Sequence, residues 1–357
     1  MGQLIPAQDA VAAPQETEAP QEIAAPERTR SGYSQRLYLP TFLVAAAAAW
    51  LAWRGWQELS EFGPLRAIHA EQAELAGPAV ISFVLAVFVI EQIRPAERHR
   101  VLARGHVLDL IYLLSYALIV VPIIALIGNG FSGALLHAAP WMVLPRTSAV
   151  PHWVIVAVAV IAIDAMDWLA HLGNHKLNSL WRLHAVHHSQ EELSILTTFR
   201  AHPLVHVSFL VSSLPVLALI ANDATPAAVL TVYACLGALP HANVRWTYGR
   251  AGLLFISPAY HRIHHSATGR LDINLGTVLT VWDAATRRAV FPARGAGPVV
   301  TGLTGRPVPV EQTPGRARFG RVFLTQWVEP FTRWTNTVPP DGPARAVTVT
   351  ADPLHQE

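Results

Sequence analysis

The fold is decided by residues 150–188, which read VPHWVIVAVAVIAIDAMDWLAHLGNHKLNSLWRLHAVHH. Residues 150–170 are almost wholly apolar, and Asp164 and Asp167 are their only acidic residues. A membrane crossing needs about 20 such residues. His171 and His175 follow directly, so a continuing helix places both imidazoles on one face. This stretch predicts an apolar helix whose end carries a pair of metal-binding side chains.

The composition is that of a chain with little surface for water. Of 357 residues, 52% are hydrophobic and 14% are charged, whereas soluble domains have about 25% charged residues. This excludes a disordered chain, an ordinary water-soluble enzyme and a nucleic-acid binder with a basic face. The formal net charge of +2 indicates no partner. Cys235 is the only cysteine, which excludes intrachain disulfides and Cys-ligated clusters.

Further apolar runs predict more crossings, near 37–53, 78–93, 107–128, 150–170 and, more weakly, 204–221 and 225–240. The alternative is a soluble protein with buried core helices, which runs such as 108–127 disfavour. With six crossings, the Arg-rich segments 28–36, 94–104, 176–200 and 245–270 lie on one side. Positive charge marks the cytoplasmic side. We therefore predict an all-α integral membrane protein of about six transmembrane helices, with both termini and a histidine-rich helical catalytic cap in the cytoplasm.

Four regions follow from this pattern. Residues 1–36 carry Pro among Ala, Gln and Glu and predict a disordered tail. Residues 37–149 hold the N-terminal transmembrane helices, with 129–149 in the far membrane interface. Residues 150–290 form a catalytic domain with three histidine boxes, and 291–357 form a cytoplasmic C-terminal tail. Within that tail, apolar residues recur at helical spacing from Phe319 to Phe331, which fits either an interfacial helix or one packed on the domain.

Three histidine clusters stand out among the 17 histidines. His171 and His175 form an HxxxH pattern. Two HxxHH patterns follow, one of His184, His187 and His188, the other of His261, His264 and His265. A single histidine is usually a solvated or core residue, but chance predicts only roughly 0.04 HxxHH patterns in such a chain. Neutral imidazole binds Fe, Zn, Cu and Ni, and eight such residues fit two ions better than one.

The order of these motifs resembles that of the fatty acid hydroxylase / sterol desaturase superfamily of membrane histidine-box di-iron oxygenases. The resemblance covers about 155–288. It is carried by Asp164 before the box of His171 and His175, by Leu180 to Ser189, by Thr197 or Thr198 through Arg200 to His202 and Pro203, by His241 and Asn243, by Ser257 to Ser266, by Asp272, Asn274 and Gly276, and by Trp282 and Asp283. Leu172 stands where the family usually has Arg, and Ala284-Ala285-Thr286 where Phe-Gly-Thr is common. These departures place the chain in a divergent branch.

The resemblance implies two non-haem iron ions and ten histidine ligands. These are His171, His175, His184, His187, His188, His202, His241, His261, His264 and His265. His206, one helical turn after His202, is the rival for one place. His202 is favoured because it precedes Pro203 and so is expected to be extended, just before a helix.

Polar residues near the boxes are candidates to bond the far nitrogens of metal-bound imidazoles. Asp164 and Asp167 share a helix face with His171, and Asn243, Asp272 and Asn274 stand beside the later boxes. For Asn274, turn chemistry is an equally good explanation. An Asp within an apolar helix is costly unless it serves a site.

Such a site predicts O₂ as co-substrate and hydroxylation or desaturation of a membrane lipid, either a sterol-like compound or a fatty acyl chain. The electrons must come from an external donor, which the resemblance implies is a ferredoxin or a cytochrome b5-type protein with an NAD(P)H reductase. Two other classes are a membrane zinc hydrolase and a non-enzymatic metal-binding membrane protein. A zinc hydrolase needs a general base such as the Glu of HExxH, and no box here contains it.

Overall fold

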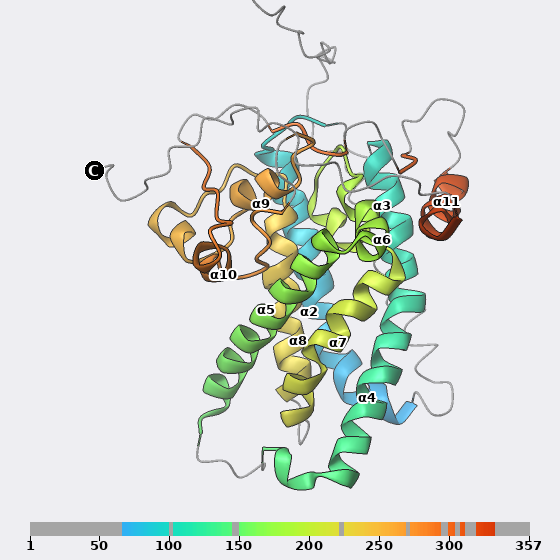
Figure 1. Ribbon diagram of the computed structural model, residues 1–357, viewed down its shortest axis with the longest axis vertical. Coiled ribbons are helices and arrows are strands. Elements are labelled where there is room, and N and C mark those ends of the chain that lie inside the picture. The colour runs from blue at the N-terminus through green and yellow to red at the C-terminus, as the bar shows by residue number, and fades with distance from the viewer. Residues whose placement is uncertain are drawn as a thin grey trace, which may run out of the picture. The chain divides into compact units, whose positions relative to one another are not determined.

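Long apolar helices form the body of the described part of the computed structural model (Figure 1). The structure describes residues 66–99, 103–144, 150–220, 225–268, 272–293, 299–303, 308–310 and 319–332. Among these residues all regular elements are helical, and β-pairing is confined to the isolated bridges Phe255–Leu279 and Ser266–Thr301. The helical prediction is thus confirmed for this part of the chain. The predicted tail at 1–36 and the predicted span at 37–53 lie outside the described residues.

The elements follow one another in a simple order. They are α2 (Arg66–Ile93), α3 (Arg104–Ser115), the π-helical turn η2 (Tyr116–Val120), α4 (Val121–Ala138), η3 (Pro140–Met142), α5 (His152–Lys176), α6 (Asn178–His188), η4 (Ile195–Phe199), α7 (Pro203–Leu219), α8 (Thr225–Ala238), η5 (Leu239–His241), η6 (Gly249–Leu253), α9 (Pro258–His264), α10 (Val281–Ala285) and α11 (Phe319–Thr332).

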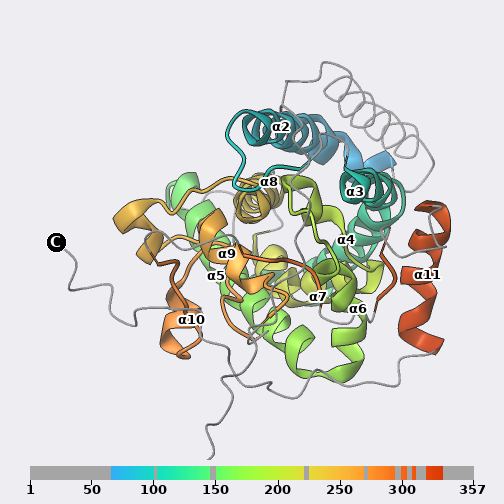
Figure 2. The ribbon, with the colours of Figure 1, turned by 90° about the horizontal axis from the view of Figure 1, so that it is seen from above.

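The long helices form a bundle. Helix α5 packs against α7 and α8, α2 packs against α8, and α4 packs against α7 (Figure 2). Ala159, Val160 and Ile163 of α5 form a common core with Leu217 and Val229. These contacts bury one apolar stripe of each helix.

Two helices are long and apolar enough to cross a bilayer. One is the continuous helix α3–η2–α4, of 35 residues, and the other is α5, of 25 residues. Shorter apolar helices cover Ala79–Ile93, Pro203–Leu219 and Ala228–His241. Described helices therefore coincide with five of the predicted spans, while the number of crossings stays a prediction.

The helix α3–η2–α4 is longer than the run 107–128 predicted. It continues through Phe131 and Leu135 to Ala138, into a segment expected to lie in the membrane interface. Apolar residues continue past Gly128, Gly130 and Gly133. The helix ends at Ala138, just before Ala139 and Pro140, because Pro lacks an N–H donor.

Short elements cap one end of the bundle. Helices α6, α9 and α10 lie at the end of the bundle where α5 terminates (Figure 1). Helix α11 lies beside α3 and α6, and its Val322, Phe323 and Trp327 pack against Tyr112 and Trp181. Of the two possibilities for the 319–331 periodicity, the structure shows the helix packed on the domain.

Candidate metal centre

The first histidine box lies in the last two turns of α5. His171 and His175 share one face of this helix, and α6 begins at Asn178, directly after α5 ends. The short connection turns the chain back, so α6 presents His184 and His188 to the end of α5. The i, i+4 spacing within each helix brings both of its imidazoles to the same side.

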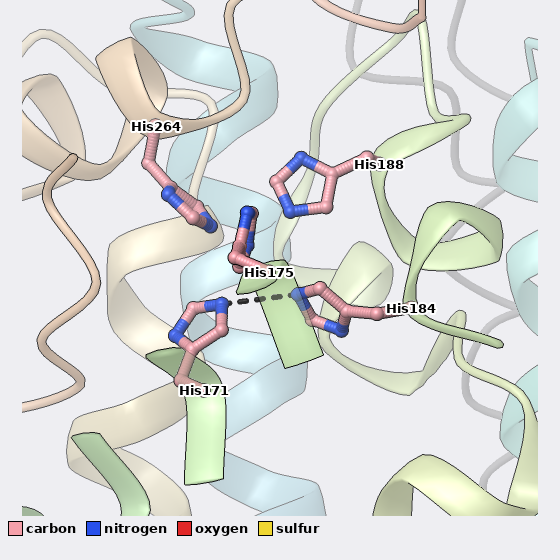
Figure 3. A group of neighbouring side chains, drawn as sticks. All are labelled: His171, His175, His184, His188 and His264. Atoms are coloured by element: carbon pink, nitrogen blue, oxygen red, sulfur yellow. Dashed lines mark hydrogen bonds between the residues drawn. The ribbon is translucent and has the colours of Figure 1, made fainter. Parts of the chain in front are cut away.

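One group of five histidines forms where α5, α6 and α9 meet. It contains His171, His175, His184, His188 and His264, each with one ring nitrogen within 4.8 Å of those of the others (Figure 3). The Nε2 atoms of His171 and His184 are 3.0 Å apart. We call these five residues the first group.

A second group consists of His187, His241, His261 and His265. The Nε2 atom of His241 lies 3.1 Å from that of His187 and 3.1 Å from that of His261. His241 reaches this position from η5, at the end of α8. The structure therefore brings nine of the ten predicted ligands into two groups.

Each HxxHH box is divided between the two groups. In α6, His184 and His188 enter the first group and His187 enters the second. In α9 the assignment is reversed, since His264 belongs to the first group and the i, i+4 pair of His261 and His265 to the second. The groups are adjacent: the rings of His188 and His265 stack with centroids 4.6 Å apart.

Backbone carbonyls fix the orientation of several of these rings. Nδ1 of His171 bonds the carbonyl of Leu275 at 2.7 Å, and Nδ1 of His264 bonds that of Ile273 at 2.8 Å. Nδ1 of His187 bonds the carbonyl of Arg200 at 3.1 Å. Because a carbonyl only accepts, Nδ1 carries the hydrogen in each case and Nε2 keeps a lone pair for a metal.

The ring of His241 is oriented by a side chain instead of a backbone carbonyl. Its Nδ1 lies 3.1 Å from the hydroxyl of Thr198, in the segment that also supplies Arg200. The hydroxyl can accept from Nδ1–H, which again leaves Nε2 facing the second group.

The nine imidazoles are buried, with exposed fractions between 0% and 8%. Burial lowers the pKa of His188 well below its usual value, and the neighbouring His264 and His265 lower it further. Burial has the same effect on the pKa of His265. A depressed pKa keeps an imidazole neutral, which is the form that binds metal.

The donor set fits metal ions. Both ring nitrogens of His265 and Nε2 of His188 and His264 are buried without a hydrogen-bond partner, a costly state for polar atoms. Ligand nitrogens about 2.1 Å from one ion and about 90° apart are about 3.0 Å from each other, as observed for the Nε2 pairs. Among the described residues both groups consist only of histidine, a donor set suited to Fe, Zn, Cu or Ni.

His202, the tenth predicted ligand, lies outside both groups in this structure. It is the N-terminal cap of α7, where Nδ1 accepts from the N–H of Leu204 at 3.2 Å. Its Nε2 lies 3.1 Å from the carbonyl of Trp327 in α11. The extended conformation expected before Pro203 is present, but it serves the helix end. The rival, His206, faces Tyr116 and also lies outside both groups.

Asp164 acts on a loop rather than directly on an imidazole. Its carboxylate accepts from the N–H groups of Val278 and Leu279 at 2.8 and 3.0 Å, and from Nε1 of Trp282 at 2.8 Å. Asp283 holds the same loop by accepting from the N–H of Leu275 at 3.0 Å. The loop carries the Leu275 carbonyl that orients His171, so Asp164 and Asp283 position that ring indirectly.

The other predicted polar residues also bond protein groups around the site. Asp167 accepts from the Ser212 hydroxyl at 2.9 Å, which ties α5 to α7. Asp272 pairs with Lys176 at 2.5 Å. The remaining two are amides: Asn243 accepts from Arg262 at 2.9 Å, and Asn274 bonds the backbone of Tyr260 and Val290 from a left-handed conformation, φ 54°.

A buried ion pair behind the second group was missed by sequence reasoning. The side chains of Asp109 in α3 and Arg200 are both fully buried, and their Oδ1 and Nε atoms are 2.5 Å apart. Gln190 donates to Asp109 at 2.6 Å, and Arg200 donates to the carbonyl of Gly105 at 3.0 Å. The available signal was that Asp109 alone carries charge in the run 107–128.

These features define a helical protein with two adjacent, buried, all-histidine groups that could each hold a metal ion, at one end of an apolar bundle. Residues 156–287 match the fatty acid hydroxylase family. The resemblance to the fatty acid hydroxylase superfamily seen in the sequence is thus confirmed for this part of the chain. No solved structure matches it.

Several characterised proteins are similar to part of the chain. The ornithine lipid hydroxylase OlsE of Rhizobium tropici is 29% identical over 181 residues, which are 50% of each chain. The alkylglycerol monooxygenase of Homo sapiens is 28% identical over 177 residues, 48% of this chain and 38% of that protein. That of Danio rerio is 29% identical over 145 residues, 39% and 30% respectively. The chain thus matches half or less of the length of these relatives.

Proposed function

We propose that this protein is a membrane-bound, non-haem di-iron enzyme that uses O₂ to hydroxylate a lipid. The observation that carries the proposal is the convergence of nine buried histidines into two adjacent groups at the end of an apolar bundle. Two iron ions bound there would supply the activation of O₂ and the oxidation of an unactivated C–H bond.

The residues of the chain have defined tasks in this proposal. The first group would hold one ion and the second group the other, and the ring contact between His188 and His265 keeps the two groups adjacent. The carbonyls of Leu275, Ile273 and Arg200 hold Nδ1–H of their imidazoles, so that Nε2 faces the ion. Burial excludes bulk water from the ligands, which protects a reactive site from side reactions.

A location in the membrane is supported by the exposure of the apolar helices. In the most apolar stretch of α3–η2–α4 only 18% of the residues are buried, and in α5 33% are. Leu126 is 57% exposed and Val158 is 60% exposed. The core helix of a soluble protein would be mostly buried, whereas lipid-facing side chains need no protein cover.

Lipid hydroxylation, rather than desaturation, is favoured by the relatives, which are named as a hydroxylase and as monooxygenases. Their substrates, an ornithine lipid and alkylglycerols by name, support a polar lipid with an alkyl or acyl chain as the substrate, and a sterol-like compound is the alternative. Electrons would come from an external ferredoxin or cytochrome b5-type donor with its NAD(P)H reductase.

The zinc hydrolase alternative lacks a general base. Neither histidine group includes a carboxylate among the described residues. Of the two acidic residues after the second box, Glu192 accepts from the N–H of Gly105 at 3.0 Å. That bond holds Glu192 against the start of α3, so it is not placed to act as the general base that the Glu of HExxH supplies.

Two measurements on one preparation test the proposal. Protein purified from membranes of iron-supplied cells should contain about two irons per chain, and cells that express it should accumulate a lipid with one ¹⁸O-labelled hydroxyl when given ¹⁸O₂. A His184→Ala/His261→Ala variant, with one ligand removed from each group, is the control for both. One zinc per chain with no iron, or the product formed without O₂, would contradict it.

A further inference from the structure

Five large apolar side chains are exposed on two neighbouring segments of the cap. The exposed fractions are 38% for Trp246, 41% for Leu253, 49% for Leu254, 44% for Phe255 and 41% for Val281. We call these five residues the apolar loop surface. Soluble proteins seldom gather large apolar side chains in this way unless the surface has a partner.

The two segments are bonded to each other, so they present these side chains together. The N–H of Thr280 donates to the carbonyl of Leu254 at 2.9 Å, and the Thr280 hydroxyl donates to that of Leu253 at 2.6 Å. Phe255 forms a β-bridge with Leu279. The apolar loop surface therefore belongs to an ordered part of the fold.

The surface is attached to α5 at a depth where lipid is expected. Asp164 holds the N–H groups of Val278 and Leu279. It comes 12 residues after His152, where α5 begins, which is about 18 Å along the axis. The hydrocarbon core is about 30 Å thick. If α5 crosses from His152, the loop beside Asp164 lies at the level of the cytoplasmic half of the hydrocarbon core.

The neighbouring face of α5 is apolar as well. Val158 is 60% exposed, Ile161 is 47% exposed and Leu169 is 53% exposed, and these residues precede and follow Asp164. The segment that carries Val281 is thus bonded to a candidate membrane span that itself has exposed apolar side chains.

Basic residues flank this surface. Arg245 and Arg250 are exposed, and the sequence from Val244 to Leu271 contains no acidic residue. Arg side chains near a bilayer are attracted by anionic headgroups, and Trp is enriched at the membrane interface. An apolar centre with a basic rim is complementary to a lipid surface.

We propose that the apolar loop surface is seated in the cytoplasmic leaflet of a phospholipid bilayer. Leu253, Leu254 and Phe255 reach the acyl-chain boundary, and Arg250 meets the lipid phosphates. This inference rests on the proposed crossing of the membrane by α5. Because the chain passes from Phe255 through Ile256 and Ser257 into α9, the seat also anchors the third histidine box at the lipid surface.

Site-directed spin labelling of the full chain tests the insertion of the apolar loop surface into the bilayer, since Cys235 is the only cysteine to remove. In a Cys235→Ser background, nitroxides are placed by Leu254→Cys, directly after the short helix η6, and by Arg250→Cys within η6 as the matched control. The protein is reconstituted in vesicles of phosphatidylcholine and phosphatidylglycerol. O₂ partitions into lipid and a nickel chelate into water. We expect the label at 254 to collide severalfold more with O₂ than with the nickel chelate, and the label at 250 to show the reverse.

A third label, Leu126→Cys on α4, separates this inference from the proposed function. A water-accessible label at 254 with a lipid-accessible label at 126 overturns the insertion of the apolar loop surface and leaves the membrane crossing intact. A label at 254 shielded from both reagents overturns it in favour of a protein partner, such as a second copy or an electron donor. A water-accessible label at 126 contradicts the proposed membrane crossing, and the seat with it. Iron content of each labelled protein verifies that its fold is intact.

Discussion

At the scale of single residues, the site depends on which nitrogen of each imidazole is occupied. His187 gives Nδ1–H to the carbonyl of Arg200 and has Nε2 3.1 Å from that of His241. His202 has both nitrogens engaged, by the N–H of Leu204 and by the carbonyl of Trp327. Two histidines in one motif region therefore have different tasks, one in the second group and one in helix capping.

The second group should lose its metal independently of the first. For His187→Ala we expect the iron content to fall from about two to about one per chain, because the second group drops from four histidines to three while the five histidines of the first group are untouched. Metal analysis of the purified variant measures this, and lipid hydroxylation should be abolished because one ion is missing. His184→Ala is the counterpart in the first group. Retention of two irons by both variants would contradict the assignment.

His202→Ala should retain about two irons per chain and lose stability instead. The variant removes the cap that accepts from Leu204 and the contact with Trp327, and losing a helix cap costs about 1 kcal/mol. A thermal unfolding scan in detergent, with iron analysis of the same sample, separates the two effects. If iron were lost from this variant while its unfolding temperature stayed unchanged, His202 would be a ligand after all.

At the scale of elements, α3 supports the second group although it lies outside the family match at 156–287. Asp109 of α3 pairs with Arg200, and the Arg200 carbonyl orients His187. Both partners of the pair are fully buried. Removing one charge of a buried pair leaves the other uncompensated, at a cost of about 3–5 kcal/mol.

Asp109→Asn should therefore lower the iron content of the second group more than that of the first. The control is Asp167→Asn, another buried acid, whose partner Ser212 ties α5 to α7 and does not contact a ligand ring. Both variants should unfold at lower temperature, but only Asp109→Asn should change the iron stoichiometry and the Mössbauer spectrum of the remaining iron. Equal iron loss in the two variants would reduce Asp109 to a purely structural residue.

The sequence predicted the elements better than their assembly. The pairs His184–His188 and His261–His265 follow from helical periodicity, which depends only on local spacing. Their division between two groups depends on how α6 and α9 face each other, and no local pattern encodes that. The ring partners are carbonyls of Leu275, Ile273 and Arg200, and a carbonyl is present at every residue. His202 is predicted as a ligand because it precedes Pro203. A residue just before Pro is equally typical of a helix start, which is the place that His202 has in the structure.

At the scale of the whole molecule, the two ends of α5 differ in chemistry. Its second residue, Trp153, is 72% exposed, and Trp141 of the preceding element η3 is 79% exposed. Its end carries His171 and His175 and is followed by the basic cap. A helix of 25 residues extends over about 37 Å, enough to separate two aqueous faces. Exposed Trp at one end and Arg at the other match a membrane interface and a cytoplasmic surface.

This polarity predicts opposite accessibility at the two ends. In the Cys235→Ser background, Trp141→Cys should react with a membrane-impermeant maleimide added to intact spheroplasts of a bacterial host. Arg287→Cys, in the exposed turn after α10, should react only after lysis, because the Arg-rich segments predict a cytoplasmic cap. Gel-shift labelling before and after lysis measures both positions in the same cells. Reaction of Arg287→Cys in intact cells, with Trp141→Cys protected, would invert the orientation. Reaction of both in intact cells would mean that α5 does not separate the two faces.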